Sequence, residues 1–454
     1  MVRAMQPQIL PRKEHRISRK HINQNVLRTL YRLRDKGFIA YLIGGCVRDL
    51  LLDRTPKDFD IATNATPNQI KRLFRNCRLV GRRFRLAHLH FSDGILEVST
   101  FRASAPSGEE ETEEPGLENR PPRHLKDSDG MVLRDNVFGT PEEDALRRDF
   151  TINALAYSIE DFSVIDYSTG LSDLREGLIR PIGDPYERFT EDPVRMLRAV
   201  RFAATHGFTI EESTWEVIRR LSFTISRASP ARLYEEMLKL FLMGSSRPVF
   251  DLLETSGLLA ALFPLLGQWL SGSSDHRAAL AANLEGLDRL FQSGTAPSPA
   301  LFFAALFGPS LEEGALEHQR DGIPRQQSLD AVCTAFLQEL RNIVSLPARI
   351  GAQMRTILAV QTALHRRPPR RPAIMAGRAG FADALAYLRL TAEWKRENQA
   401  ALKWWEAYLS GVPAKMEAEP SPEEAPVKRR RKKRRRHRPA APTAAIPGAP
   451  EAGS

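Results

Sequence analysis

The sequence contains little cysteine and has no long apolar run. Only 3 of its 454 residues are cysteines, too few for a disulfide framework, and they lack the paired spacing of a zinc site. No apolar stretch approaches the roughly 20 residues that a membrane-spanning helix needs. The first thirty residues are polar and basic, without the apolar segment of a secretory signal. These absences argue against a disulfide-stabilised, membrane-spanning or secreted protein, so we expect the chain in the reducing cytoplasm.

Positive charge is present in excess, and it is unevenly distributed. The chain has 66 Lys and Arg against 55 Asp and Glu, a formal net charge of +11. Segment 411–454 holds 11 basic and 5 acidic residues, so more than half of the excess lies there. Because its Pro-, Glu- and Ala-rich flanks cannot form a core, we expect a disordered tail. The basic run Lys428–Arg438 would bind a nucleic-acid backbone through counterion release; a solvated tail or a targeting signal is the alternative interpretation.

Local patterns predict a small mixed α/β domain, followed by helices. Apolar spacing indicates a helix over 22–36, Thr66 and Pro67 form a helix start, and Asp93-Gly94 marks a hairpin. Residues 104–130 are acidic, then Pro-rich, and are expected to form a disordered loop. From residue 141 helices dominate, interrupted by weak boundaries near 271–298 and 308–327. They are expected at 191–206, 211–223, 230–243, 246–256, 328–343, 346–366 and 381–409.

Two glycines followed by two aspartates form the sharpest local feature. Gly44 and Gly45 precede a helix, where backbone N–H groups could approach a phosphate, and Arg48 could pair with a phosphate or a carboxylate. On a strand, Asp58 and Asp60 would project from the same face. Their mutual repulsion would be relieved by Mg²⁺, which prefers carboxylates plus substrate phosphates. The pattern favours metal-dependent phosphoryl transfer, the alternative being an ordinary turn and a solvated strand.

Two later motifs combine guanidinium groups with carboxylates. Arg147–Asn153 is predicted to open an apolar helix. Its two cations, Arg147 and Arg148, beside the carboxylate of Asp149 suit a site that meets a triphosphate and a ribose, with Asn153 as a further candidate nucleotide contact. The alternative for the two arginines is the start of a surface helix. Residues 191–203 are predicted to form a helix with Pro near its start and acids in its first turn.

The second of these motifs places acids and cations three or four residues apart. Glu191 and Arg195 are spaced i, i+4, Asp192 and Arg195 are spaced i, i+3, and Arg198 extends the same ridge. An exposed, salt-bridged helix would look the same. The functional interpretation is that these side chains face the nucleotide.

The order of these motifs resembles the class II nucleotidyltransferases, the family of bacterial poly(A) polymerases and tRNA CCA-adding enzymes. The motifs are GGCVRD, KDFD, RRDFTINALAY and EDPVRMLRAVRFA. The resemblance implies an α+β fold, with a small polymerase-β-like α/β head followed by all-helical neck, body and tail domains and a disordered basic C-terminus. We place the head at 20–165, the neck at 166–265, the C-terminal helical domain at 266–410 and the tail at 411–454.

The resemblance also implies the chemistry. Asp58 and Asp60 would bind Mg²⁺ while an RNA 3′-hydroxyl attacks the α-phosphate of a nucleoside triphosphate and pyrophosphate leaves. Asp149 would be a ribose contact or a third catalytic carboxylate, and Glu97, on a predicted strand of the head, competes for the second role. Asp192, Arg195 and Arg198 would offer hydrogen bonds to the base, in place of a template.

Two features favour the poly(A) polymerase branch. Residues 79–89 (LVGRRFRLAHL) resemble a segment of the bacterial poly(A) polymerases, and a basic tail suits an enzyme that takes varied RNA ends. The expected activity is AMP addition from ATP to RNA 3′ ends, tagging RNA for decay, with the RNA-decay machinery as a possible partner. A CCA-adding enzyme and a non-catalytic RNA-binding protein are the alternatives.

Overall fold

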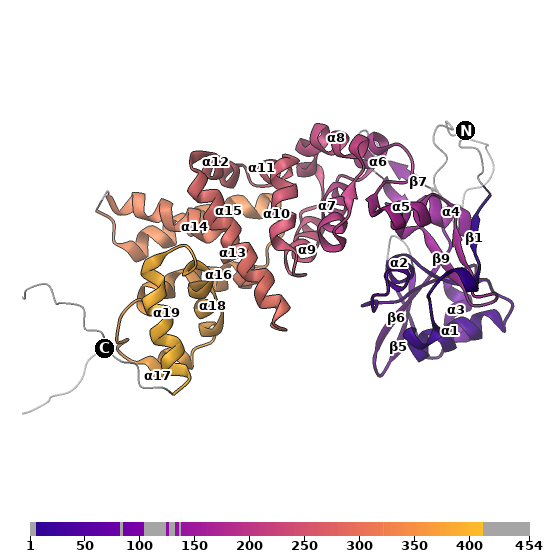
Figure 1. Ribbon diagram of the computed structural model, residues 1–454, viewed down its shortest axis with the longest axis horizontal. Coiled ribbons are helices and arrows are strands. Elements are labelled where there is room, and N and C mark those ends of the chain that lie inside the picture. The colour runs from indigo at the N-terminus through magenta and orange to yellow at the C-terminus, as the bar shows by residue number, and fades with distance from the viewer. Residues whose placement is uncertain are drawn as a thin grey trace, which may run out of the picture. The chain divides into compact units, whose positions relative to one another are not determined.

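The computed structural model (Figure 1) describes residues 6–81, 85–103, 124–126, 132–135, 138–320 and 322–411. The chain folds as two compact units, Met1–Trp405 and Glu406–Ser454. The predicted boundaries at 165 and 265 therefore remain predictions. Most of the loop expected at 104–130, and the basic run Lys428–Arg438, lie outside the described residues.

The head is a mixed sheet with helices, as the sequence predicts. Its strands and helices are β1 (Gln8–Leu10), α1 (Gln24–Arg34), β2 (Ala40–Ile43), α2 (Gly45–Leu51), β3 (Asp60–Thr63), α3 (Pro67–Leu73), β4 (Cys77–Val80), β5 (Leu86–Phe91), β6 (Gly94–Thr100), β7 (His124–Lys126), β8 (Val132–Asp135), α4 (Pro141–Leu146), β9 (Leu155–Ser158) and β10 (Val164–Asp166). Short 3-10 helices lie at Arg12–Glu14, Arg19–His21 and Thr151–Asn153, the last labelled η3.

The main sheet has the strand order β1-β10-β9-β2-β3-β6-β5-β4. Every neighbouring pair is antiparallel except β3 and β6. One face contributes Leu42 and Ile61 to the large core shared with α1, α2 and α3. The other face carries a small cluster that includes Ile43 and Ala62. Since alternate residues share a face, Asp60 lies on the side of Ala62, away from that large core.

Several local predictions for the head are confirmed. Thr66 caps α3 in a capping box with Pro67 at the first helical position. The antiparallel register pairs Phe91 with Gly94, so the predicted hairpin is present, with Ser92 and Asp93 in its turn and Gly94 as the first residue of β6. The loop prediction is wrong at its end, because β7 pairs with β8 from residue 124.

The rest of the described chain is mostly helical. Its elements are α5 (Gly170–Glu176), β11 (Leu178–Ile179), α6 (Pro185–Glu191), α7 (Val194–His206), β12 (Thr209–Ile210), α8 (Glu212–Leu221), the 3-10 helix η4 (Ser222–Arg227), α9 (Pro230–Phe241), α10 (Ser246–Thr255), α11 (Leu258–Leu262), α12 (Pro264–Gly272), α13 (Ser274–Gln292), α14 (Pro299–Arg320), α15 (Arg325–Ile343), α16 (Ala348–Leu364), α17 (Pro372–Ala376), α18 (Phe381–Thr391) and α19 (Arg396–Leu409). The parallel pair of β11 and β12 is a small departure from an all-helical neck. Among the described residues, no helix has the length and apolarity to cross a bilayer.

Two helix predictions at the later motifs are wrong. The residues after Arg147 form η3 and then β9, a strand buried on both faces; a short apolar run gives the same pattern for a buried helix. The helix expected over 191–206 is split, since α6 ends at Glu191 and α7 begins at Val194. Pro193 causes the break, because the preceding residue is pushed out of the helical region, and Asp192 has an extended φ of -150°. Glu191 and Asp192 therefore precede α7 and do not lie in its first turn.

Helices α13 and α14 cover much of the stretches expected as weak boundaries at 271–298 and 308–327, but α13 ends at Gln292, α14 begins at Pro299 and α15 begins at Arg325, so helix ends fall inside both stretches and these boundaries stay predictions. One helix prediction for the body is wrong. The helix expected over 381–409 is two helices, α18 and α19.

Helix α14 forms the centre of the helical body. Its Phe302, Phe303 and Phe307 are almost completely buried. A Cβ added at Gly308 would lie 2.3 Å from the Tyr387 hydroxyl oxygen of α18. Gly308 therefore lets α18 pack closely against α14.

The different surroundings of two glycines in α14 predict different effects of alanine substitution on the free energy of unfolding. Gly308→Ala should lower the free energy of unfolding by about 1–3 kcal/mol, because the added methyl group overpacks the core. Gly314→Ala in α14 should leave it unchanged or raise it by up to about 1 kcal/mol, since a helical glycine is unfavourable and its added Cβ is 3.6 Å from Val332. Thermal unfolding followed by circular dichroism measures both. Equal effects would contradict this account of the packing.

Candidate active site

Asp60 is the first residue of β3 and lies beside a second carboxylate. The parallel register pairs it with Glu97 of β6, and the antiparallel register pairs it with Ile43 of β2. Asp58 is exposed and precedes the strand, so the prediction that both aspartates sit on the strand is wrong. The reason is that β2 ends at Ile43, where Gly44 begins a turn and leaves Asp58 without a pairing partner in that strand.

The environment of Asp60 disfavours its negative charge. Burial raises the pKa of this carboxyl, and the charges of Glu97 and Asp58 raise it further, while Arg148 lowers it. A bound cation would relieve this concentration of negative charge.

Gly44 forms a tight turn next to the guanidinium group of Arg148. Its φ of +77° favours glycine, and its N–H donates to the Leu155 carbonyl at 3.1 Å. A Cβ on Gly44 would lie 2.9 Å from Nη1 of Arg148, so a side chain there would displace the guanidinium. Arg148 is held by Asp144, with Nη2 3.0 Å from Oδ2. Gly45 follows as the first residue of α2.

Arg48 pairs with carboxylate and amide groups of the protein itself. Its side chain is buried, its Nε and Nη2 donate to Oδ1 of Asp49 at 2.9 and 2.7 Å, and its Nη1 donates to Oδ1 of Asn153 at 2.7 Å. Of the two partners that the sequence left open for Arg48, the structure shows the carboxylate. Asn153 continues the chain of hydrogen bonds, since its Nδ2 donates to Oδ1 of Asp149 at 3.2 Å.

Asp149 ends this chain of hydrogen bonds in a partly buried ion pair with Arg198. Nε of Arg198, on α7, donates to its Oδ2 at 2.6 Å, and the Phe150 N–H donates to its Oδ1 at 2.9 Å. Burial alone would raise the pKa of Asp149, but Arg198 and the hydrogen bonds from Asn153 and Phe150 lower it to about 2. The ionised carboxylate therefore links the motif Arg147–Asn153 to helix α7.

The acids and cations around α7 have separate partners. Arg232 of α9 holds Asp192 through two bonds of 3.0 and 2.7 Å. Nη1 of Arg195 lies 3.0 Å from Oε2 of Glu191, which confirms that predicted pair. Since Arg198 bonds Asp149, the three residues expected to face a base are each engaged with other groups of the protein.

Two residues near the site were missed by sequence reasoning. Nη2 of Arg188, on α6, donates to the carbonyl oxygens of Arg147 and Arg148 at 2.8 and 2.7 Å, which fixes the backbone next to Asp149. His88 lies opposite Glu97 in the hairpin, with Nε2 3.5 Å from Oε1. Hairpin register could have revealed His88, whereas Arg188 left no local signal beyond its spacing from Glu191.

The donor set fits a cation that the substrate helps to hold. In the described residues, no three His, Cys, Asp or Glu side chains converge as a complete metal site. Mg²⁺ is usually bound by one or two carboxylates plus substrate phosphates. The negative surroundings of Asp60 and the neighbouring Asp58 match that pattern.

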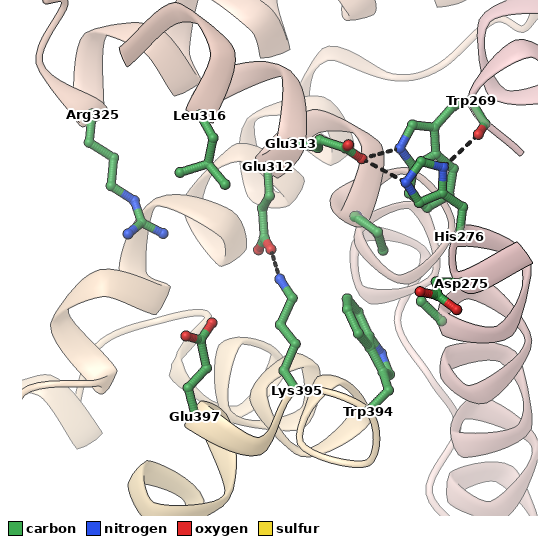
Figure 2. Close-up of a pocket in the computed structure, with 12 residues that line it drawn as sticks. Trp269, Asp275, His276, Glu312, Glu313, Leu316, Arg325, Trp394, Lys395 and Glu397 are labelled. Carbon is green, nitrogen blue, oxygen red and sulfur yellow. Dashed lines mark hydrogen bonds and ion pairs between the residues drawn. The ribbon is translucent and has the colours of Figure 1, made fainter. Parts of the chain in front are cut away.

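A cavity in the helical body has a different chemical character from the surroundings of Asp60 (Figure 2). It has a volume of about 410 Å³ and is lined by side chains that include Trp269, His276 and Trp394. Its Glu313 pairs with His276 at 3.1 Å, and its Glu312 pairs with Lys395. Its carboxylates would repel a triphosphate, so it is a poor site for ATP.

Three family models match the sequence. They are the Poly A polymerase head domain over residues 40–180, the Probable RNA and SrmB- binding site of polymerase A over 207–270, and the Polymerase A arginine-rich C-terminus over 321–439. The last range includes the basic run Lys428–Arg438.

Curated relatives match over most of the chain. Poly(A) polymerase I of Salmonella typhi is 42% identical over 430 residues, which cover 93% of this chain and 90% of the relative. The Haemophilus influenzae enzyme of that name is 39% identical over 86% of each chain. A CCA-adding enzyme of Lactobacillus helveticus is 37% identical, but over only 49% of this chain and 51% of its own.

Solved structures share the fold. The Bacillus stearothermophilus CCA-adding enzyme in complex with CTP has a TM-score of 0.59 and 25% identity, covering 86% of this chain and 82% of its own. The Thermotoga maritima CCA-adding enzyme complexed with tRNA has a TM-score of 0.55 and 21% identity, covering 89% and 87%.

The depressed pKa of Asp149 predicts a pH-dependent stability contribution. The folded value of about 2 lies below the ordinary 3.8, so the stabilisation is fully present above pH 3.8 and is lost as the pH falls towards about 2. Asp149→Asn should lower the free energy of unfolding at neutral pH by on the order of 2 kcal/mol, and by less below about pH 4. Urea unfolding of both proteins over this pH range measures the difference. A difference that stays constant with pH would contradict the assignment; exposed Asp35→Asn is the control.

Proposed function

The chain belongs to the poly(A) polymerase family of nucleotidyltransferases, and from this premise we propose that it adds AMP from ATP to RNA 3′ ends without a template. The observation that carries the proposal is the group formed by Asp60, its neighbours Glu97 and Asp58, and the glycine turn with Arg148. The group combines carboxylates for a cation with the Arg148 guanidinium for phosphates, beside a turn whose glycines leave room for a phosphate to approach.

The reaction forms one phosphorus–oxygen bond and breaks another. The RNA 3′-hydroxyl oxygen attacks the α-phosphate of ATP and loses its proton, and the bond from the α-phosphorus to the bridging oxygen breaks, releasing pyrophosphate. Asp58 and Asp60 would hold the divalent cation, which when bound neutralises phosphate charge and activates the attacking oxygen. Gly44, Gly45 and Arg148 bind the triphosphate.

Asp149 has a positioning role in this proposal. Its two oxygens already accept hydrogen bonds from Arg198, Asn153 and the Phe150 N–H. We therefore favour Glu97 over Asp149 as the third carboxylate beside Asp60. Asp149 and Asn153 orient Arg48 and Arg198 around the nucleotide, and an Asp149 contact with the ribose remains compatible with this role.

The base would be read by groups on both sides of the break at Pro193. Asp192 and Arg195 carry the donors and acceptors that a Watson–Crick edge requires, and Arg232 and Glu191 hold them in place. The basic run Lys428–Arg438 would add backbone affinity for RNA. Marking RNA for decay is the expected cellular role.

CCA addition is the second candidate, because the two solved structures described above, which share the fold, are CCA-adding enzymes. The extent of the sequence matches favours polyadenylation. The two poly(A) polymerase relatives match across 90% and 86% of their lengths, whereas a CCA-adding relative matches across 51% of its length.

The first test of the proposal removes the carboxylates. Asp58→Ala and Asp60→Ala should each reduce AMP incorporation by more than about 1000-fold, because transition-state charge stabilisation worth several kcal/mol is lost. RNA affinity, measured by fluorescence anisotropy, should change little. Asp35→Ala serves as a control at an exposed carboxylate of the head. Normal incorporation by either variant would refute the catalytic assignment, and no ATP consumption by the wild-type protein would favour the non-catalytic alternative.

The second test separates the two activities. After incubation of unstructured RNA and tRNA lacking its 3′ terminus with all four nucleoside triphosphates, the 3′ ends are sequenced. We expect tracts of A on both RNAs, since a polymerase that accepts varied ends needs no tRNA fold. Termination at CCA on tRNA alone would overturn the proposed specificity.

A further inference from the structure

Four arginines gather on one exposed segment of the helical body. Arg366, Arg370, Arg371 and Arg378 line a pocket of about 300 Å³. The other lining residues are Ala363, Ile374 and Met375, so the lining contains no carboxylate. All four arginines are exposed. We call this set the arginine cluster.

The cluster differs from Arg247 and Arg277 of the same helical region, which are paired with carboxylates. Arg247 lies 3.0 Å from a carboxylate oxygen of Asp251, and Arg277 lies 2.7 Å from one of Glu254. Such pairs neutralise the charge locally. Four neighbouring guanidinium groups without a carboxylate in their pocket repel one another, and an anion with several charges would relieve that repulsion.

The polypeptide on both sides of the cluster is firmly anchored. Nε1 of Trp405 donates to the carbonyl oxygen of Leu364 at 3.1 Å. The next residue, His365, has Nε2 2.6 Å from Oδ1 of Asn398. On the other side, Phe381 is buried at the start of α18. The arginines are therefore presented by a fixed frame, which lowers the entropy cost of binding.

We propose that the arginine cluster binds the sugar–phosphate backbone of the RNA substrate, upstream of the 3′ end that reacts. The inference rests on the proposed function, which supplies a polyanion that must extend beyond the active site. Guanidinium groups match phosphates through paired N–H donors. Ile374 is 54% exposed and offers an apolar surface for a ribose or a base. The pocket lining has no aromatic ring to stack an adenine, so an RNA backbone fits better than ATP.

This site is separate from the RNA contacts considered so far. The cluster lies outside residues 207–270, which match the family model described as a probable RNA-binding site, and inside residues 321–439, which match the model of an arginine-rich C-terminus. It also precedes the basic run Lys428–Arg438 by about fifty positions. The cluster has a defined geometry and should engage a fixed part of the RNA.

The test replaces all four arginines with glutamine in the full chain. We measure affinity for an unstructured RNA of about 30 nucleotides and a primer of about 8 nucleotides, over a series of salt concentrations. The variant should bind the long RNA about 10- to 100-fold more weakly at low salt and with a salt slope smaller by up to about 3, since each phosphate contact on a single strand contributes about 0.7. Primer affinity should be unchanged.

A matched control removes the same charge elsewhere in the helical body. Arg325, Arg341, Arg349 and Arg396 are exposed and do not line the arginine pocket. Their fourfold replacement by glutamine should leave the salt slope near that of the wild type. An equal loss in both variants would show a general charge effect and overturn the site. Unchanged affinity of the cluster variant would also overturn it.

Further measurements distinguish loss of RNA binding from a folding defect, from binding of an acidic protein and from failure of the proposed function. The pairs Arg366→Gln with Arg370→Gln, and Arg371→Gln with Arg378→Gln, should each give part of the effect, so a folding defect in the fourfold variant cannot mimic the result. Stronger competition by polyglutamate than by RNA would assign the cluster to an acidic protein and contradict the proposal. AMP incorporation onto the short primer reports separately on the proposed function, whose failure would leave the affinity comparison between the variants intact.

Discussion

The ion pair between the largely buried Asp149 and the partly exposed Arg198 is the interaction on which the arrangement of the site depends. A buried carboxylate is tolerated only when it is paired and hydrogen-bonded. Meeting that requirement brings together residues far apart in the sequence, because Asn153 links Asp149 to Arg48 while Arg198 links it to α7. The motif Arg147–Asn153 is therefore fixed in position relative to helix α7.

Two aspartates of the site have opposite electrostatic character. Cations and hydrogen bonds keep Asp149 ionised, with a pKa of about 2. Burial and neighbouring carboxylates raise the pKa of Asp60 instead. The two aspartates therefore suit different roles. Both oxygens of Asp149 already accept hydrogen bonds from the protein, so Asp149 suits a positioning role. Asp60 has a raised pKa that a bound cation would lower, so it suits cation binding. The glycine turn and Arg148 lie next to Asp60, at the place where a triphosphate would add negative charge.

Much of this could be predicted from the sequence, and the failures have physical causes. The paired glycines, the two aspartates and the Asp93-Gly94 hairpin are encoded in residues close together in the chain, where turn chemistry and alternation are informative. The strand at Leu155 was missed because burial on both faces removes the alternation. Long-range partners leave no such pattern, so the sequence could indicate Asp192 as a site residue but not that Arg232 would hold it. The choice between Glu97 and Asp149 depended on strand register.

The central claim is that Asp149 and Arg198 act as a coupled pair that positions the nucleotide. A double-mutant cycle with Asp149→Asn and Arg198→Gln, read as kcat and KM for ATP, tests it most directly. The account predicts that each single variant raises KM for ATP more than it lowers kcat, and that the double variant is little worse than either. Additive effects, or a loss of kcat by Asp149→Asn as complete as that of a carboxylate in direct contact with the cation, would contradict it.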